Sequence, residues 1–399
     1  MVDSRRRTAT AAIHTRQAAT SARPLSSPIF QSTAFAAASA DDLARVAGEV
    51  ATPDFYTRHG NPNHVELAEA VATLERAEAG LVLGSGMGAL TTTLLALVSS
   101  GQHIVAQRSM YGGSLSVVQK LLPRFGVTYT LVDQAEAGAW AEAITPATRV
   151  FLIESPSNPR LEISDLGAIA EVARARDIVT VADNTFATPI NQRPGEAGID
   201  LVWHSATKYL AGHSDASAGV VVGRAELIET IWNTSLNVGA VLGPIDAWLV
   251  TRGIRTLDLR VGRHNATALA IAEHLRAHPT VEAVYYPGLP GHASHAVAAR
   301  QMSGFGGVLS IELPGDREET ARSIERLELF QLSASLGSVE SLVVHPASMW
   351  GAVLTDQQMS AAGVAPGLVR LACGLEDAAD LIADLDRALH AHRPRGGGQ

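Results

Sequence analysis

The sequence contains a single cysteine among 399 residues, so no disulfide can form within the chain. Cys373 lies in the apolar stretch 368–373, where a thiol serves as a small core side chain. The first 23 residues have no apolar run of the kind found in secretory signals. Both features are typical of a reducing compartment, and we expect a cytoplasmic protein.

Two further absences exclude classes of partner. No segment has the uninterrupted apolar length of a membrane span, because even residues 81–100 are punctuated by glycine, serine and threonine. Basic charge is also scarce, since 31 Lys and Arg stand against 40 Asp and Glu, for a formal net charge of -9. No stretch is basic enough to neutralise a phosphate backbone. We therefore expect neither a membrane nor a nucleic acid as a partner.

What the sequence does contain is enough apolar residues, 46%, for a large core. Short apolar runs alternate with helical patterns in the first half of the chain. These runs are 81–83, 104–106, 150–153, 178–182 and 201–203. Alternation of this kind predicts an α/β fold whose mostly parallel sheet is covered by helices on both faces.

Changes in pattern along the chain predict three parts. Residues 1–62 have little regular pattern and form an expected N-terminal arm. A large domain at 63–255 opens with an amphipathic helix expected from Asn63 to a stop at Gly80. After a helical region at 227–278, strand-like runs and helices predict a smaller α+β domain at 256–399.

Two charged residues follow apolar runs. Lys208 comes shortly after the run 201–203, and a lysine in a dry crevice has a neutral amine that can form a Schiff base with an aldehyde. Asp183 ends the run 178–182, where a carboxylate can pair with a protonated ring nitrogen. A surface lysine and a helix-capping aspartate are the ordinary alternatives. Because polar residues after parallel strands meet at one edge of a sheet, the pair predicts a shared site.

The glycine string from Gly84 to Ala89 follows a strand and opens a helix, so its backbone N–H groups can bind a phosphate. Ser205 and Thr207 add hydroxyl groups beside Lys208. The same string fits a dinucleotide-binding fingerprint, which leaves a nicotinamide-dependent oxidoreductase as an alternative. That fingerprint requires an acidic residue about twenty positions later, and residues 106–108 are Ala, Gln and Arg. The phosphate cradle is therefore favoured.

Tyr111 and Arg370 are further candidates. Tyr111 precedes two glycines, and its ring can stack on a planar cofactor while its phenol moves protons; a packed loop tyrosine is the alternative. Arg370 interrupts the apolar run 368–372, where a guanidinium needs an anion. That anion is either a substrate carboxylate or the partner of a structural ion pair.

Ordered motifs lie between Tyr56 and Asp377, within a similarity that extends from about Pro28 to His390. They are Tyr56-Thr57-Arg58 with Asn61-Pro62, Ser85-Gly86-Met87, Tyr111-Gly112-Gly113, Glu154-Ser155-Pro156 with Asn158-Pro159, Asp183-Asn184-Thr185-Phe186, Ser205 with Thr207-Lys208-Tyr209, Ser335-Leu336-Gly337, and Gly374-Leu375-Glu376-Asp377. In these motifs the chain resembles the pyridoxal-phosphate (PLP) enzymes of cysteine and methionine metabolism, such as cystathionine gamma-lyase, cystathionine gamma-synthase and methionine gamma-lyase. The resemblance implies an aspartate-aminotransferase-like fold (fold type I) with a mostly parallel seven-stranded sheet and a smaller C-terminal domain.

The resemblance also implies roles. Lys208 would hold pyridoxal 5'-phosphate and move protons, Asp183 would pair with the ring nitrogen, and Tyr111 would stack on the ring. The other expected cofactor contacts are Tyr56, Arg58, Ser85, Gly86, Met87, Asn158, Thr185, Ser205 and Thr207. The residues expected to bind the substrate are Ala334, Ser335, Leu336 and Arg370. Tyr56 and Arg58 would reach the cofactor of a neighbouring subunit through the arm, which implies a homotetramer built from active dimers; no metal is expected.

The implied reaction is gamma-elimination by a carbon–sulfur lyase acting on methionine, homocysteine or cystathionine, which gives a 2-oxo acid, ammonia and a thiol. Gamma-replacement on an O-acylhomoserine is the alternative within the family, and a silent binding protein on the same fold is an alternative outside it. Three departures bear on the substrate, one of which is Trp350 in place of the Thr-His that commonly follows Pro-Ala-x-Met. Ala334 stands where cystathionine-handling members usually have Glu, and Gly113 stands where methionine gamma-lyases usually have Cys.

Overall fold

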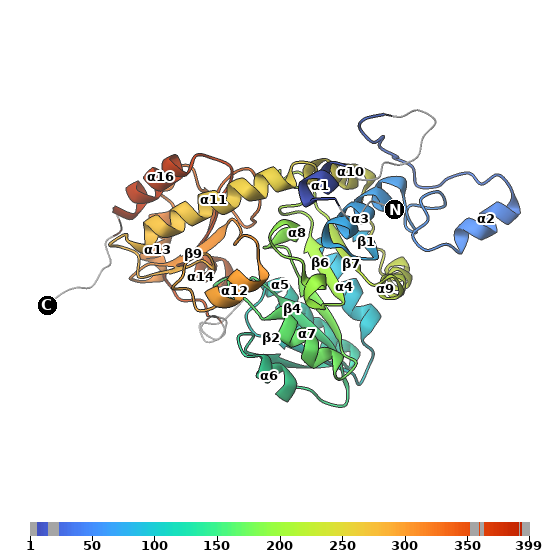
Figure 1. The fold of residues 1–399 in the computed structure, drawn as a ribbon, viewed down its shortest axis with the longest axis horizontal. Helices are drawn as coiled ribbons and strands as arrows, with labels where there is room; N and C mark the ends of the chain where they lie inside the picture. The colour runs from blue at the N-terminus through green and yellow to red at the C-terminus, as the bar shows by residue number, and fades with distance from the viewer. Residues whose placement is uncertain (1–5, 15–23, 352–358, 360–362, 391, 393–399) are drawn as a thin grey trace.

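Figure 1 shows the computed structural model of the chain, which describes residues 6–14, 24–351, 359, 363–390 and 392. Two sheets organise the molecule, one in the middle of the view and one among the C-terminal helices. The expected arm at 1–62 lies partly outside the described residues, and the domain limits at 62 and 255 stay predictions. Among the described residues, no helix is long and apolar enough to cross a membrane.

The larger sheet has seven strands in the order β1-β7-β6-β5-β4-β2-β3. Their bounds are β1 Ala79–Leu83, β2 His103–Gln107, β3 Thr128–Val132, β4 Thr148–Glu154, β5 Val179–Asp183, β6 Leu201–Ser205 and β7 Gly219–Gly223. All neighbours run parallel except β7, which is antiparallel to β1 and β6. The expectation of a mostly parallel seven-stranded sheet is confirmed.

The smaller sheet has five strands in the order β10-β11-β12-β9-β8. Their bounds are β8 Ala283–Tyr285, β9 Val308–Glu312, β10 Gln331–Leu332, β11 Leu342–Val344 and β12 Leu368–Ala372. Only β10 and β11 pair in parallel. Short strands of mixed direction beside helices give this part the α+β character that the sequence predicts.

Helices lie on both sheets and on the N-terminal arm, where Figure 1 shows α2 apart from the sheets. They are α1 Thr8–Ile13, α2 Ala40–Ala47, α3 Pro62–Glu75, α4 Gly86–Leu97, α5 Gly112–Ser116, α6 Ala137–Glu142, α7 Leu166–Arg174, α8 Thr188–Asn191, α9 Ala225–Val238, α10 Pro244–Ile254, α11 Leu257–Arg276, α12 His295–Gln301, α13 Arg317–Ile324, α14 Pro346–Trp350 and α16 Ala378–His390. Within the described residues, a π-helical turn at Val117–Leu121 and 3-10 turns at Leu122–Phe125 and Pro194–Ala197 complete the set. The helical region expected at 227–278 is thus three helices, α9 to α11.

The helix expected from Asn63 to Gly80 is shorter than predicted. It ends at Glu75, because Arg76 adopts a left-handed conformation with a φ of 58° and turns the chain into β1. Gly80 is therefore a strand residue rather than a helix stop. A Cβ at Gly80 would lie 2.9 Å from the carbonyl oxygen of Ala68, so the glycine lets β1 pass close to α3.

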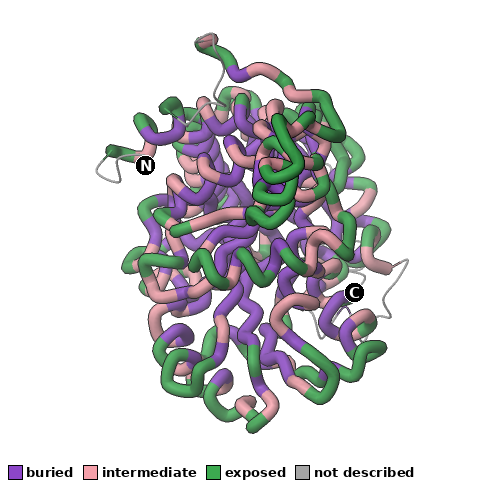
Figure 2. Tube along the Cα trace, turned by 90° about the vertical axis from the view of Figure 1, so that its right-hand side faces the viewer, coloured by how far each residue is buried: buried purple, intermediate pink, exposed green. Residues whose placement is uncertain are grey.

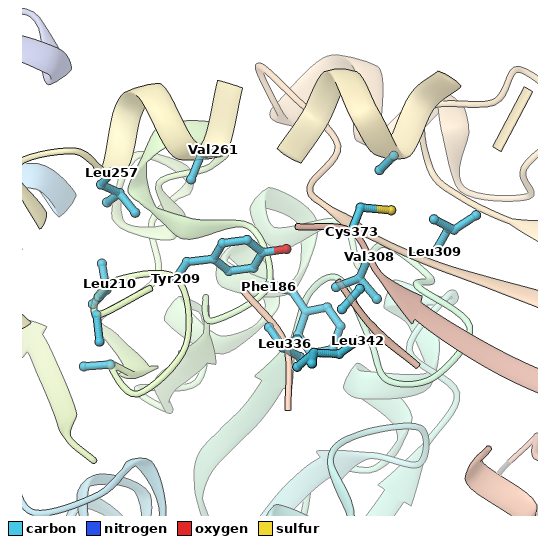
Figure 3. Close-up of a cluster of buried hydrophobic side chains, with 14 of the residues drawn as sticks. Phe186, Tyr209, Leu210, Leu257, Val261, Val308, Leu309, Leu336, Leu342 and Cys373 are labelled. Atoms are coloured by element: carbon cyan, nitrogen blue, oxygen red, sulfur yellow. The ribbon is translucent and has the colours of Figure 1, made fainter. Parts of the chain in front are cut away.

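The core lies on both faces of the large sheet, and Figure 2 shows buried chain through the interior with exposed loops around it. Leu90 of α4 and Trp232 of α9 pack on one face, and Ile169 of α7 packs on the other. A further cluster joins the large sheet to the small one. Figure 3 shows Tyr209 and Cys373 in it, so the cysteine is a core residue as expected.

Candidate active site

The site begins at the carboxyl edge of the large sheet. Glu154 ends β4, Asp183 ends β5 and Ser205 ends β6. Asp183 pairs in register with Glu154 on one side and with Trp203 on the other. Since registered neighbours face the same side of a sheet, Asp183 points to the face that α4 covers. The parallel strands therefore gather the polar residues that follow them, as the sequence predicts.

Asp183 is a buried carboxyl group, 7% exposed. The backbone N–H of Thr185 donates to its Oδ1 at 2.9 Å. Burial raises the pKa of Asp183 to about 6, and the hydrogen bonds from Thr185 oppose that rise. A carboxylate in this setting is stabilised by a nearby cation, so Asp183 fits a protonated ring nitrogen.

Lys208 reaches across to the loop that follows β10 of the second sheet. Its Nζ donates to the hydroxyl oxygen of Ser335 at 2.8 Å, although the two residues are far apart in sequence. Burial and the charge of Arg370 lower the pKa of Lys208. The amine is thus more often neutral than that of an exposed lysine, which is the form that attacks an aldehyde.

The glycine string opens α4 as a cradle. The Ser85 hydroxyl accepts the backbone N–H of Gly88 at 2.9 Å and caps the helix. Gly86 lies against Ser205, because a Cβ at Gly86 would be 2.7 Å from the Cβ of Ser205. Thr207 closes the loop after β6 by accepting the N–H of Ala218 at 3.0 Å. The N-terminus of α4 and the Ser205 hydroxyl therefore lie side by side, which is an arrangement that suits a phosphate.

Tyr111 lies beside this cradle with 45% of its surface exposed. A Cβ at Gly113 would be 2.5 Å from Cε1 of Tyr111 and 2.9 Å from the sulfur of Met87. The ring therefore occupies the space that a side chain at position 113 would need. The departure at Gly113 thus has a physical consequence, since a cysteine there requires a different ring position.

Arg370, in β12, is 7% exposed. Its Nη1 donates to Oδ1 of Asn158 at 3.1 Å and its Nη2 to the carbonyl oxygen of Ser335 at 3.0 Å, while its Nε is buried without a partner. By comparison, the deeply buried Arg260 donates from Nε, Nη1 and Nη2 to protein oxygens. Burial lowers the pKa of Arg370 to about 10. An incompletely bonded guanidinium at the site fits an incoming carboxylate better than a structural ion pair.

Four predicted residues lie differently from the rest. Arg58 is exposed, donates from Nη1 to the carbonyl oxygen of Leu236 at 2.8 Å, and lies 5.8 Å from the ring centre of Tyr56. This pair is therefore on the arm beside α9 within its own chain. The side chain of Leu336 is part of the hydrophobic cluster in Figure 3, so only its backbone is left to contact a substrate. Ala334 is exposed beside Ser335.

Glu154 is a site residue to which the sequence pattern assigned no role. It is 2% exposed, its Oε2 accepts the backbone N–H of Tyr111 at 2.7 Å, and its Oε1 accepts that of Asn158 at 2.9 Å. Burial and the neighbouring Asp183 raise the pKa of Glu154 well above its ordinary value, while the N–H groups of Tyr111 and Asn158 oppose that rise because they favour the carboxylate. The signal that marked Asp183, an acid at the end of an apolar run, is present here too.

The chain matches the family described as Cys/Met metabolism PLP-dependent enzyme over residues 9–390. It is 42% identical to an L-methionine gamma-lyase of Fusobacterium nucleatum subsp. nucleatum, over 92% of this chain and 93% of that one. It is 45% identical to a cystathionine beta-lyase of Coxiella burnetii, over 84% and 87% of the two chains.

Among solved structures, a cystathionine gamma synthase from Xanthomonas oryzae pv. oryzae in complex with cystathionine superposes with a TM-score of 0.91. That structure is 39% identical and covers 96% of this chain and 98% of its own. The chain therefore belongs to the Cys/Met metabolism PLP-dependent enzyme family and is an enzyme that uses pyridoxal phosphate rather than a nicotinamide cofactor.

Proposed function

We propose that the enzyme catalyses gamma-elimination on a sulfur-containing amino acid such as methionine or homocysteine, releasing a thiol, ammonia and a 2-oxo acid. The observation that carries this choice is Ala334, an exposed methyl group next to the Ser335 hydroxyl that binds Lys208. A distal charge on the substrate finds no counterpart at this position, whereas an apolar thioether needs none. The name of the Fusobacterium relative, L-methionine gamma-lyase, supports the same choice.

Gamma-replacement on an O-acylhomoserine is the second candidate. It uses the same binding groups and differs only in whether an external thiol attacks before the product leaves. The similarity to a cystathionine gamma synthase, which is 39% identical to this chain, supports gamma-replacement as this second candidate.

The residues present fit pyridoxal phosphate. Its phosphate suits the cradle between Gly86 and Ser205, which has no room for a side chain at position 86. Its ring nitrogen suits the buried carboxyl of Asp183, and its aldehyde suits the amine of Lys208. When bound, the cofactor supplies an electron sink that acidifies the C–H bonds near the substrate's amino group.

The side chains around the bound cofactor have separate roles. Asp183 keeps the ring nitrogen protonated, because a buried carboxylate favours a cation beside it. Lys208, with its lowered pKa, accepts and returns protons at Nζ from a position fixed by Ser335. Arg370 holds the substrate carboxylate through a planar fork of N–H groups, and Asn158 holds that fork in place.

We further propose a cytoplasmic homotetramer. The buried state of the lone Cys373 suits a reducing compartment. The arm exposes apolar side chains, with Leu25 93% exposed and Ile29, Leu43 and Tyr56 also exposed, and such a surface is typical of a subunit interface. Light scattering of the purified enzyme tests the assembly, and a monomeric mass contradicts it.

The reaction is tested by comparing kcat/KM for release of ammonia and 2-oxo acid from methionine, homocysteine, cystathionine and O-acylhomoserines, the last with and without added thiol. Methionine or homocysteine as the best substrate supports gamma-elimination. Thioether product exceeding 2-oxo acid with O-acylhomoserine and thiol favours replacement. Cystathionine as clearly the best substrate overturns the proposal.

Ala334→Glu tests the role of position 334. We expect kcat/KM for cystathionine to rise relative to methionine, because the new carboxylate meets the distal ammonium of cystathionine. The gain is limited to about fivefold, since an exposed ion pair contributes up to about 1 kcal/mol. Ala334→Gln, similar in size but uncharged, is the control, and an equal gain in that variant contradicts the electrostatic explanation.

Arg370→Lys tests the carboxylate fork. The lysine keeps the positive charge but loses the paired N–H groups and the contact with Asn158. We expect kcat/KM to fall about 30- to 1,000-fold, mostly through a higher KM, because a buried charge pair loses about 2 to 4 kcal/mol when one partner is altered. Steady-state kinetics with the amino acid and with its decarboxylated amine separate the two effects. The amine lacks the carboxylate, so parent and variant should process it equally; a large difference there assigns Arg370 another role.

A further inference from the structure

One buried carboxylate joins two loops, one that carries the proposed ring-stacking residue Tyr111 and one that carries Asn158, which contacts the substrate-binding Arg370. The backbone N–H of Tyr111 donates to Oε2 of Glu154, and the backbone N–H of Asn158 donates to Oε1. Both oxygens are thus engaged by groups that donate and cannot accept. Bonds from backbone N–H to a carboxylate are among the stronger hydrogen bonds in proteins.

The backbone of Glu154 is itself fixed. Gln107, fully buried at the end of β2, accepts the N–H of Glu154 at 2.8 Å and donates to its carbonyl oxygen at 2.9 Å. Register with Asp183 in β5 holds the other side of the strand. The carboxylate therefore extends from a strand end that is held on both sides, and it fixes two loops to that strand.

The Asn158 loop passes this constraint on. The side-chain oxygen of Asn158 accepts Nη1 of Arg370, Nη2 of Arg370 donates to the carbonyl of Ser335, and the hydroxyl of Ser335 accepts Nζ of Lys208. A shift of Glu154 thus reaches both the ring of Tyr111 and the groups at Arg370 and Lys208.

We infer that Glu154 is a positioning residue that sets the tilt of Tyr111 over the cofactor and the grip of Arg370 on the substrate carboxylate. The inference rests on the proposed cofactor and substrate roles of Tyr111, Lys208 and Arg370. It assigns Glu154 no contact with substrate. Replacing Glu154 should therefore change the geometry of the bound cofactor and the KM for substrate. A loss of folding stability alone would not produce these two changes.

Glu154→Gln is the test, because the amide keeps the shape but replaces one accepting oxygen by a donating NH2 group. One of the two loops must then lose its anchor. We expect kcat/KM to fall about 10- to 100-fold, the range for losing one hydrogen bond to a charged group. We also expect the circular dichroism of the cofactor's visible band, per bound cofactor, to change in amplitude, since that signal reports the orientation of the ring's surroundings.

Glu319→Gln is the matched control. Glu319 is also buried and also accepts a backbone N–H, that of Asp316 at 3.0 Å, but it does so in the capping box of α13. Glutamine serves in such boxes as well, so kinetics and dichroism should stay within twofold of the parent.

The outcomes separate this inference from the function on which it rests. Borohydride reduction of the parent, followed by peptide mapping, first establishes whether cofactor binds Lys208; a negative result defeats the proposed function. A positive result, together with parent-like KM and dichroism in Glu154→Gln, overturns the inference alone. If Glu154→Gln does not fold, Glu154→Asp takes its place, because it keeps both oxygens but is too short to reach both N–H groups. The same two readouts decide: a shift supports the positioning role of Glu154, and unchanged values refute it.

Discussion

Lys208→Ala is expected to abolish covalent attachment of pyridoxal phosphate and to lower kcat by at least about 10³-fold. The side chain has two tasks in the proposal, forming the bond to the cofactor and moving protons, and proton transfer alone contributes about 10²- to 10⁴-fold. The backbone around it should survive, because the segment is held by main-chain bonds such as that from Gly212 N to Lys208 O at 2.7 Å. Visible absorbance, borohydride reduction and single-turnover kinetics measure the loss.

The composition of the chain makes this experiment unusually clean. Of its 31 basic residues only two are lysines, Lys120 and Lys208, and the others are arginines. Lys120 is exposed in the π-helical turn and has no role in the proposed site. Lys120→Ala is thus a complete control. A pyridoxyl group found on Lys120 in the parent, or a Lys208→Ala variant with more than a tenth of parental turnover, contradicts the assignment.

Asp183→Asn is expected to lower activity while stabilising the cofactor-free protein. Asparagine cannot hold a proton on the ring nitrogen, and disrupting a buried charge pair costs about 3 to 5 kcal/mol. We therefore expect kcat to fall about 10²- to 10³-fold. Replacing the cofactor by an analogue that carries a permanent positive charge at the ring nitrogen should recover part of the loss, and no recovery contradicts a role in ring protonation.

The stability effect has a definite sign. Burial raises the pKa of Asp183 from 3.8 to about 6 in the folded state, so the folded protein binds the proton more tightly than the unfolded chain does. Folding stability contributed by this group is therefore present below 3.8 and is lost as the pH rises to about 6. Asparagine does not ionise, so the variant avoids this loss. Its free energy of unfolding should exceed that of the parent by up to about 3 kcal/mol at neutral pH. Melting of cofactor-free parent and variant at pH 5 and pH 8 should show a larger gain at pH 8; an equal or smaller gain contradicts the burial effect.

Both Asp183 and Glu154 end apolar strands, and only one of them could be interpreted from the sequence. Asp183 and Lys208 pair naturally with a charged planar cofactor, and the ordered motifs around them identified the family. Glu154 showed the same local pattern, but its meaning depends on which N–H groups its two oxygens meet. Those groups belong to Tyr111 and Asn158, on loops that follow different strands.

Strands that are marked by an apolar run of residues were predictable from the sequence. Elements that depend on contacts with residues distant in sequence were not. The runs that became β1, β2, β4, β5 and β6 are apolar because helices cover both faces, and the sequence alone marked them. The pattern did not mark β3, whose first residues are exposed, or β7, which begins and ends with glycine. Gly80 looked like a helix stop, and only its approach to Ala68 of α3 shows why glycine is there.

The sequence by itself determined the α/β class, the family and the chemical types at the site, because strand periodicity and ordered motifs are properties of neighbouring residues. The tertiary structure alone decided how those types act together. It brought Ser335 to Lys208 and Asn158 to Arg370 across more than a hundred residues, left Nε of Arg370 unbonded, and buried Asp183 until its pKa rose to about 6. Burial and long-range hydrogen bonds depend on distances in space, which adjacent residues do not encode.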